Sequence, residues 1–189
     1  NIFHIGTDLE IPDIKLHKNM KKVLNRLYQD CFEYKNINKI YTHSYEGGHP
    51  DHDAANIIVR ILTTNLNITK NIFQFPLYSG KKLWWIFFKL FDAISENGEP
   101  KNIKISNKNS FLFIRLFFSY FTVAPKTILG LSLPYIFHMV VYKTQVLQIC
   151  TNIVPSAKPH SGKLLYEKRK METYESFEKQ KEIFLDNLS

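Results

Sequence analysis

The sequence predicts an α/β domain in which short strands alternate with amphipathic helices. Runs rich in branched and aromatic residues, typical of strands, occupy positions 39–42 and 71–78. Between them, and again at 14–34, apolar residues recur at intervals of three and four, which is the period of a helix. This alternation favours a sheet covered by helices on its faces, a three-layer arrangement.

The composition fits one folded domain that covers residues 1–189. Apolar residues make up 44% of the chain and charged residues 22%, which is ordinary for a globular protein. The 25 Lys and Arg outnumber the 17 Asp and Glu, for a formal charge of +8. These cations are scattered along the sequence rather than gathered in a stripe. We therefore expect a solvated basic surface and no nucleic-acid partner.

The first third of the chain divides at its polar and glycine positions. Gly6 ends a first apolar run, and Asp8, Glu10, Pro12 and Asp13 mark a loop. The expected elements are a short strand at 2–5, a loop at 7–14, a helix at 14–34, a break at 35–38 and a strand at 39–42.

A helix follows from Pro50 to about Leu66, because proline suits the first helical turn and Ala54, Ile58 and Leu62 form one stripe. After the strand at 71–78, we expect a loop or exposed hairpin at 95–109.

In that hairpin, Ile103 and Ile105 alternate with polar residues, which indicates a strand. The aromatic-rich segment 82–91 that precedes it, with Trp84 and Trp85, has no clear period.

The region 111–149 is the most apolar, yet it is too interrupted for a membrane span. A span needs about 20 consecutive apolar residues. The longest uncharged stretch, 127–142, has 16 residues and contains Pro134 and His138. We expect buried or partly exposed helices here. Peripheral contact with a membrane surface stays open, because Phe runs accompany basic residues.

The C-terminal part closes the domain. We expect a turn-rich connection at 156–163, a short strand at 164–166 and a closing helix at 172–185 with apolar contacts from Phe177, Ile183 and Phe184. Cys31 and Cys150 both stand in apolar contexts and are interpreted as small buried hydrophobes. Two distant cysteines indicate no disulfide framework, so a reducing, cytoplasmic compartment is expected.

Residues 42–55 carry the densest chemistry in the chain. This stretch, THSYEGGHPDHDAA, directly follows the strand at 39–42 and leads into the helix at Pro50. In α/β folds, ligands bind in loops at the carboxyl ends of strands. Its chemical groups are three imidazoles and three carboxylates, from His43, Glu46, His49, Asp51, His52 and Asp53.

His49 and His52 are the principal candidates for chemistry. If Pro50 opens a helix, their spacing brings both imidazoles to one side of the loop. Histidine is both the commonest neutral metal ligand and the usual acid or base near neutral pH. Asp51 could orient or stabilise one of them. The alternative is that these residues only cap the helix and form a turn. Other candidate ligands lack a supporting pattern: His4, Asp8, His43, His138 and His160.

The segment 41–54 resembles the second motif of the PIG-L/LmbE-like zinc-dependent de-N-acetylases. The tail segment 158–167, KPHSGKLLYE, is similar to the closing segment of some members. The resemblance implies a Rossmann-like α/β fold and removal of an acetyl group from an N-acetylglucosamine-type conjugate. It also implies zinc, or another divalent metal, as the cofactor.

The resemblance also assigns roles to individual residues. His52 would be a metal ligand. His49 would stabilise the oxyanion and protonate the departing amine, and Asp51 would tune His49. Weaker candidates for substrate contact are Tyr45, Glu46 and His160.

One feature of that family is not found in this sequence. Members carry an earlier His-Pro-Asp-Asp-type motif that supplies the other metal ligands and the general base. No such motif precedes Ile40. The expectation is therefore a domain without its first strand–loop–helix unit, incomplete for catalysis as it stands.

Three functions remain open at this point. The first is a zinc-dependent de-N-acetylase acting on a small amino-sugar conjugate, which could be lipid-linked, at or near a membrane surface. The second is a non-catalytic relative that binds a glycan or a protein. The third, a metal-dependent phosphoesterase, ranks last because two-metal sites need more acids than this motif offers. The oligomeric state is not predicted.

Overall fold

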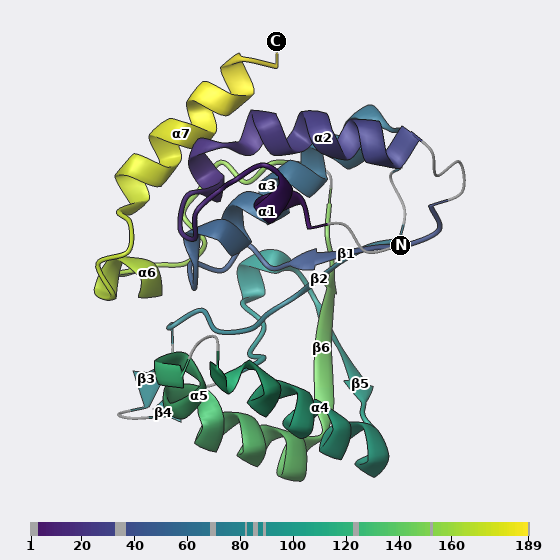
Figure 1. Ribbon diagram of the computed structural model, residues 1–189, viewed down its shortest axis with the longest axis vertical. Coiled ribbons are helices and arrows are strands. Elements are labelled where there is room, and N and C mark those ends of the chain that lie inside the picture. The colour runs from purple at the N-terminus through teal and green to yellow at the C-terminus, as the bar shows by residue number, and fades with distance from the viewer. Residues whose placement is uncertain are drawn as a thin grey trace.

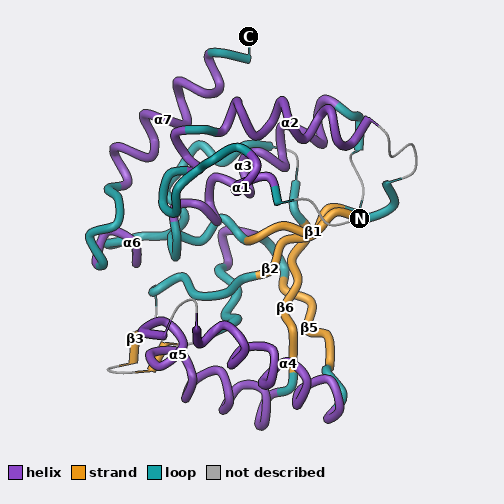
Figure 2. Tube along the Cα trace, in the orientation of Figure 1, coloured by secondary structure: helices purple, strands orange, loops and turns teal. Residues whose placement is uncertain are grey.

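The computed structural model confirms the α/β class. It describes residues 4–32, 37–68, 71–81, 83–84, 87–88, 90–122, 125–151 and 153–188. Helices lie above and below a central group of strands, which Figure 1 shows by element and Figure 2 by type of structure. The Trp85 side chain and residues 1–3 and 33–36 lie outside the described part.

The central sheet has four strands in the order β1-β2-β6-β5. β1 (Ile40–His43) and β2 (Ile72–Phe75) are parallel, whereas β6 (Thr144–Ile149) runs antiparallel to both β2 and β5 (Pro100–Lys104). A parallel pair needs a crossover connection. That connection is α3 (Pro50–Asn65), which packs against β1.

Three helices enclose the first hydrophobic core. They are α2 (Met20–Phe32), α3 and α7 (Tyr174–Asp186), which lie together in the upper part of Figure 1. Their buried side chains include Met20, Leu24, Ile57 and Phe177. The i, i+3, i+4 spacing of these residues directs one face of each helix inwards.

A second helical layer lies at the other end of the β5–β6 pair. It contains α4 (Asn107–Ser119), α5 (Pro125–Phe137) and a π-helical turn at His138–Tyr142. We refer to the described residues of 107–142 as the platform. Its inner side packs on a smaller core that includes Leu90, Phe91, Leu131, Met139 and Val146. A two-stranded hairpin, β3 (Leu83–Trp84) with β4 (Phe87–Phe88), lies beside it.

Several predicted elements are confirmed. The strands expected at 39–42 and 71–78 appear as β1 and β2, and the helices expected at Pro50 and 172–185 as α3 and α7. The strand indicated by Ile103 is β5. The helices expected in 111–149 are present as α4 and α5, but both are far more exposed than a core helix. The expectation is wrong for residues 144–149, which form strand β6 because they pair with β2 and β5. Among the described residues, no helix has the length and apolarity to cross a membrane.

Two expectations near the N-terminus are wrong. Ile5 begins a short helix, α1 (Ile5–Asp8), instead of ending a strand. The helix expected from Ile14 begins only at Met20, after a 3₁₀ turn at Leu16–Lys18. The cause is a left-handed backbone at Ile14, with φ of 65°, which no α-helix accommodates.

Two expectations near the C-terminus are also wrong. Residues 164–166 do not form a strand, because α6 spans Leu165–Lys168 and the Glu167 carboxylate accepts the Leu164 N–H at 2.7 Å. That bond caps the helix from its own first turn. Ile183 is 43% exposed and is no core contact of α7, whereas Phe177 and Phe184 are buried as expected. Cys150 is buried and free, and the Cys31 side chain lies outside the described part.

Candidate active site

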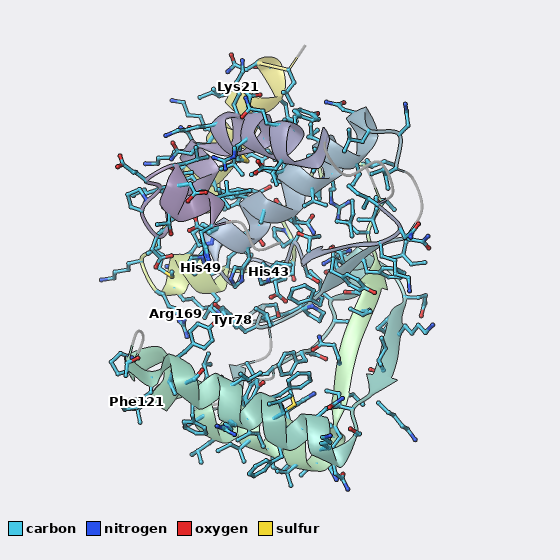
Figure 3. All side chains as sticks on the ribbon, turned by 45° about the vertical axis from the view of Figure 1, so that its right-hand side comes forward. Lys21, His43, His49, Tyr78, Phe121 and Arg169 are labelled. Carbon is cyan, nitrogen blue, oxygen red and sulfur yellow. The ribbon has the colours of Figure 1, made fainter. Side chains whose placement is uncertain are left out.

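The predicted motif lies at the carboxyl ends of the two parallel strands. Residues 44–49 follow β1 and residues 76–79 follow β2, while α3 starts at Pro50. The loop before the 3₁₀ turn at Leu16–Lys18 and the end of α6 close the sides. Figure 3 shows His43, His49, Tyr78 and Arg169 gathered there from four separate segments. Ligand sites in α/β folds form at this position because loops from neighbouring strands converge.

Buried carboxylates hold the glycine loop in place. The Asp53 side chain is fully buried and accepts N–H groups from Glu46 at 2.9 Å and from Gly47 at 3.1 Å. Glu46 Oε1 in turn accepts the N–H groups of Leu77 and Tyr78, both at 2.9 Å. These bonds tie the loop after β1 to the loop after β2. Burial raises the pKa of Glu46 to about 7, and it also raises the pKa of Asp53.

Two glycines allow this close packing. Gly47 has a φ of 73°, a left-handed conformation that favours glycine. A side chain at Gly48 would place its Cβ 2.1 Å from the Tyr78 carbonyl oxygen. The loop can therefore approach β2 only without a side chain at that position.

His49 occupies the N-cap position of α3. Its Nδ1 atom accepts the Asp51 N–H at 3.2 Å, and its Nε2 atom lies 3.8 Å from an oxygen of Asp13. A ring nitrogen that accepts a backbone N–H carries no proton, so in the neutral ring the proton is on Nε2. Burial lowers the His49 pKa, while the Asp51 and Asp13 carboxylates act in the opposite direction.

Asp51 anchors the loop that brings Asp13 to the site. Its two carboxylate oxygens accept the N–H groups of Ile14 at 2.8 Å and Leu16 at 3.0 Å. A left-handed backbone at a β-branched residue such as Ile14 costs about 1–3 kcal/mol. The two hydrogen bonds that the Asp51 carboxylate accepts offset that cost. Burial raises the Asp51 pKa, while these N–H groups and His49 oppose the rise.

His52 lies between the two other histidines of the motif, stacked on His43 and tilted against His49. Its ring centroid is 4.0 Å from that of His43, with 9° between the planes, and 5.0 Å from that of His49. Burial lowers the pKa of His43 to about 4 and of His52 to about 2, so both rings are neutral at pH 7. Within the described residues, the Nδ1 atoms of both rings are buried without a hydrogen-bond partner. Neutral imidazoles with available lone pairs are what a metal site requires.

Asp13, His49 and Asp51 form a group that could hold a metal ion. One ligand atom from each lies within 4.8 Å of the other two, and no other such group occurs among the described residues. One imidazole nitrogen and two carboxylate oxygens suit a divalent cation such as zinc. His52 does not belong to this group, although its ring centroid lies 5.0 Å from that of His49.

The weaker candidates lie apart from that group. Tyr45 is 2% exposed and packs in the first core, and Glu46 is 1% exposed. His160 is buried, with its two ring nitrogens near the carbonyl oxygens of Ser79 and Ser161. Its position therefore links the loop after β2 to the segment before α6.

Of the other candidate ligands, only His43, which belongs to the 42–55 stretch itself, contacts His52. His4 is exposed, Asp8 lies 3.5 Å from Arg26, and His138 Nε2 is 2.7 Å from the Thr144 carbonyl oxygen.

The sequence interpretation missed Asp13, Tyr78 and Arg169. Asp13 was placed only in a polar loop, and no pattern connects it with a histidine 36 positions away. Tyr78 lies 5.8 Å from His52 between ring centroids, and the Arg169 guanidinium lies 5.9 Å from the Tyr78 ring. The available signal for Tyr78 was its place as the last residue of the strand predicted at 71–78. Arg169 offered none, because it lies two positions beyond the tail segment 158–167.

A cavity of about 610 Å³ lies on another part of the surface. Its walls come from the loop 96–99 and the segment 153–159, together with Tyr45 and Gln74, and include none of the motif histidines. Arg60 contributes a guanidinium that already donates to the Thr151 and Ile153 carbonyl oxygens. Of the motif's candidate residues only Tyr45 lines this cavity, and the histidines and acids of the motif do not.

Comparison with known proteins adds no assignment. No family model, no curated protein and no solved structure matches this chain.

Proposed function

We propose that the chain belongs to a metal-dependent amide hydrolase that removes the acetyl group from an N-acetyl amino sugar or its conjugate. The observation that carries this proposal is the grouping at the ends of β1 and β2. Three histidine rings lie in contact there, with His43 stacked on His52 and both held neutral, and two carboxylates lie near His49. Amide hydrolysis needs a polarised carbonyl, an activated water and an acid for the departing amine.

His49 would supply the acid. Its Nδ1 atom is fixed by the Asp51 N–H, so the proton that can be transferred is on Nε2. That atom faces the exposed Asp13 carboxylate, 3.8 Å away. An imidazole oriented in this way can donate to an oxyanion and then protonate an amine. The carboxylate of Asp51 favours the protonated ring, which is the tuning role that the resemblance implies.

The donors present fit a divalent metal ion. Two donor sets are available, and they give His49 different roles. In the Asp13–His49–Asp51 group the His49 Nε2 atom would be a ligand and could not also act as the acid. The resemblance assigns His52 instead, whose Nδ1 atom is buried without a partner among the described residues, and leaves His49 as the acid. A bound metal would supply a Lewis acid for the carbonyl and lower the pKa of a bound water. The protein residues hold the donors in position, through the Asp51 bonds to Ile14 and Leu16.

The Rossmann-like architecture and the amino-sugar substrate are part of the same proposal. The β1–α3–β2 unit supports the architecture, because two parallel strands joined by a helix are its repeating element. The amino-sugar class rests on the resemblance of residues 41–54 and 158–167. The printed sequence contains no His-Pro-Asp-Asp-type segment, so a polypeptide that also carries one would be the active form.

Metal content and amine release test the proposal. The protein in its natural full length should bind about one zinc ion, measured by mass spectrometry of the eluted metal. It should release free amine from N-acetylglucosamine conjugates. His52→Ala and His49→Ala should each lose at least about 100-fold in kcat/KM. His4→Gln, an exposed histidine away from the motif, is the matched control and should keep full activity.

Two variants, Asp13→Asn and His52→Ala, show which residues hold the metal ion. If Asp13→Asn loses zinc, the Asp13–His49–Asp51 group holds the ion. If only His52→Ala loses zinc, the ligand is the one implied by the resemblance. A His52→Ala protein that keeps both its metal and its activity would refute the deacetylase assignment.

A non-catalytic binding domain is the second candidate function. The observation in its favour is that both Asp51 oxygens already accept backbone N–H groups, a structural role that needs no metal. This candidate predicts no zinc in the full-length protein and no amine release. It also predicts glycan binding, measured by calorimetry, that survives His52→Ala.

A further inference from the structure

We infer that the platform is a docking surface for an anionic lipid bilayer. This inference concerns a face of the molecule that the motif histidines do not form. It stands independently of the proposed hydrolase reaction.

The first observation is the amount of apolar side chain that the platform exposes. Phe111 is 72% exposed, Leu129 and Leu133 are each 64% exposed, and Tyr120 is 62% exposed. Proteins that stay free in water seldom expose contiguous apolar patches beyond a few hundred Å². Other exposed apolar side chains of the platform are Leu112, Phe113, Leu116, Phe118, Phe121, Phe137, Val140, Val141 and Tyr142.

The arrangement of the two helices makes this one continuous surface. α4 and α5 contact each other, and the Phe117 and Tyr135 rings stack at 4.3 Å on the inner side. In α4, only Ser110, Ile114 and Phe117 turn inwards. The rest of its apolar residues point away from the smaller core. Figure 1 shows both helices at the lower edge, with no helix beyond them.

The second observation is the charge of this region. Between Glu99 and Glu167 the sequence contains no Asp or Glu. Positions 100–149 carry only positive charges, at Lys101, Lys104, Lys108, Arg115, Lys126 and Lys143. A surface that is apolar, cationic and free of acids is complementary to a bilayer with anionic headgroups.

The geometry favours lying on a membrane over crossing it. α4 and α5 have 13 residues each, which is shorter than the length needed for a span. Exposed aromatic rings such as Phe111, Tyr120 and Phe121 suit the boundary between headgroups and acyl chains. Figure 3 shows Phe121 at one end of this layer.

Charge also argues against a second copy as the occupant. A two-fold dimer would place the same surface on itself. The cations of one copy would then face those of the other, with no acid in 100–149 to pair with them. An anionic lipid surface neutralises these charges, which a second copy would not do.

Vesicle sedimentation tests the inference. The protein should sediment with phosphatidylcholine vesicles that contain about 30% phosphatidylglycerol, and not with phosphatidylcholine alone. The double variant Phe111→Ser with Leu133→Ser should bind at least about tenfold more weakly. The matched double variant Tyr41→Ser with Ile153→Ser removes apolar side chains that are 54% and 73% exposed elsewhere, and it should bind like the wild type.

A charge variant completes the experiment. Lys104→Glu with Lys108→Glu should weaken binding to the anionic vesicles, and raised salt should do the same to the wild type. Circular dichroism should show that every variant is folded, since all the altered side chains are exposed.

Three results would overturn the inference. They are absence of binding to anionic vesicles, equal binding to both vesicle types, and a wild-type dimer that the Phe111→Ser, Leu133→Ser double variant dissociates. None of these outcomes depends on zinc or on amine release, so failure of the hydrolase proposal would be seen separately.

Discussion

The site-bearing half of the molecule and the platform use apolar residues in opposite ways. Around α3, apolar side chains such as Ile57 and Ile58 are buried in the core, and buried polar groups such as Asp53 are hydrogen-bonded. In the platform, Phe111, Leu129 and many others face outwards. An apolar segment in a sequence therefore marks surface that must be covered, without saying whether the covering comes from the same chain.

The largest expected difference between the two regions is in the cost of removing a leucine. Leu24 is fully buried in the first core, so Leu24→Ala should lower the free energy of unfolding by about 3 kcal/mol. Leu129→Ala, at 64% exposure, should change it by less than about 0.5 kcal/mol. Urea unfolding of both variants in the absence of lipid measures the contrast.

An equal cost at the two positions would contradict the comparison. It would mean that Leu129 is covered in solution by another copy of the chain, and concentration-dependent unfolding would then reveal it.

The regular elements around the site could be predicted because local pattern determines them. The β-branched run at Ile40, the proline at position 50 and the apolar stripe of α3 agree with one another. The delayed start of α2 could not be predicted, because it depends on Asp51 binding Ile14 from 37 positions away. The helix that begins at Leu165 is fixed by packing against Gly80 and by the Glu167 cap. Both contacts outweigh the local preference of residues 164–166 for a strand.

The candidate site was predictable in part for the same reason. His49 and His52 are only three positions apart in the sequence, so a single helical turn was enough to predict that they lie close together. Asp13 joins them only through the tertiary bonds of Asp51, which no spacing encodes. In the platform, the sequence showed apolar helices but not which side would be covered. That choice depends on tertiary packing, because the covered side is the one that meets the smaller core around Phe91 and Val146.

The second expected difference is a pH dependence that originates in the site-bearing half. Burial raises the Glu46 pKa from 4.5 to about 7, so the folded state binds this proton more tightly than the unfolded state. The contribution is present below about pH 4.5 and is lost as pH rises through 7. Its size is on the order of 3 kcal/mol.

Glu46→Gln isolates this contribution. The variant keeps an acceptor for the Leu77 and Tyr78 N–H groups and cannot ionise. Its free energy of unfolding, measured from pH 5 to 8, should gain on that of the wild type up to about pH 7 and then keep a constant lead, because above pH 7 the wild-type carboxyl is ionised in both states. Glu96→Gln is the control, because the Glu96 pKa lies at about 2 and its titration falls outside this range. Parallel curves for wild type and Glu46→Gln would show that Glu46 is ionised at little cost.

A third expected difference compares one glycine from each region. Gly48→Ala would bring its Cβ 2.1 Å from the Tyr78 carbonyl oxygen, a backbone atom that cannot easily move away. The variant should lose about 2 kcal/mol of stability, and the bonds from Glu46 to Leu77 and Tyr78 should weaken because the two loops are pushed apart.

Gly130→Ala is the platform counterpart. Nothing lies within 4 Å of a Cβ at Gly130, which is inside α5, so alanine should stabilise the helix by about 0.5–1 kcal/mol. Thermal unfolding of the two variants should therefore shift in opposite directions. A loss of stability in Gly130→Ala would mean that this face of α5 is covered in solution. The α5 face would then have to be counted with the buried part of the molecule and not with its exposed surface.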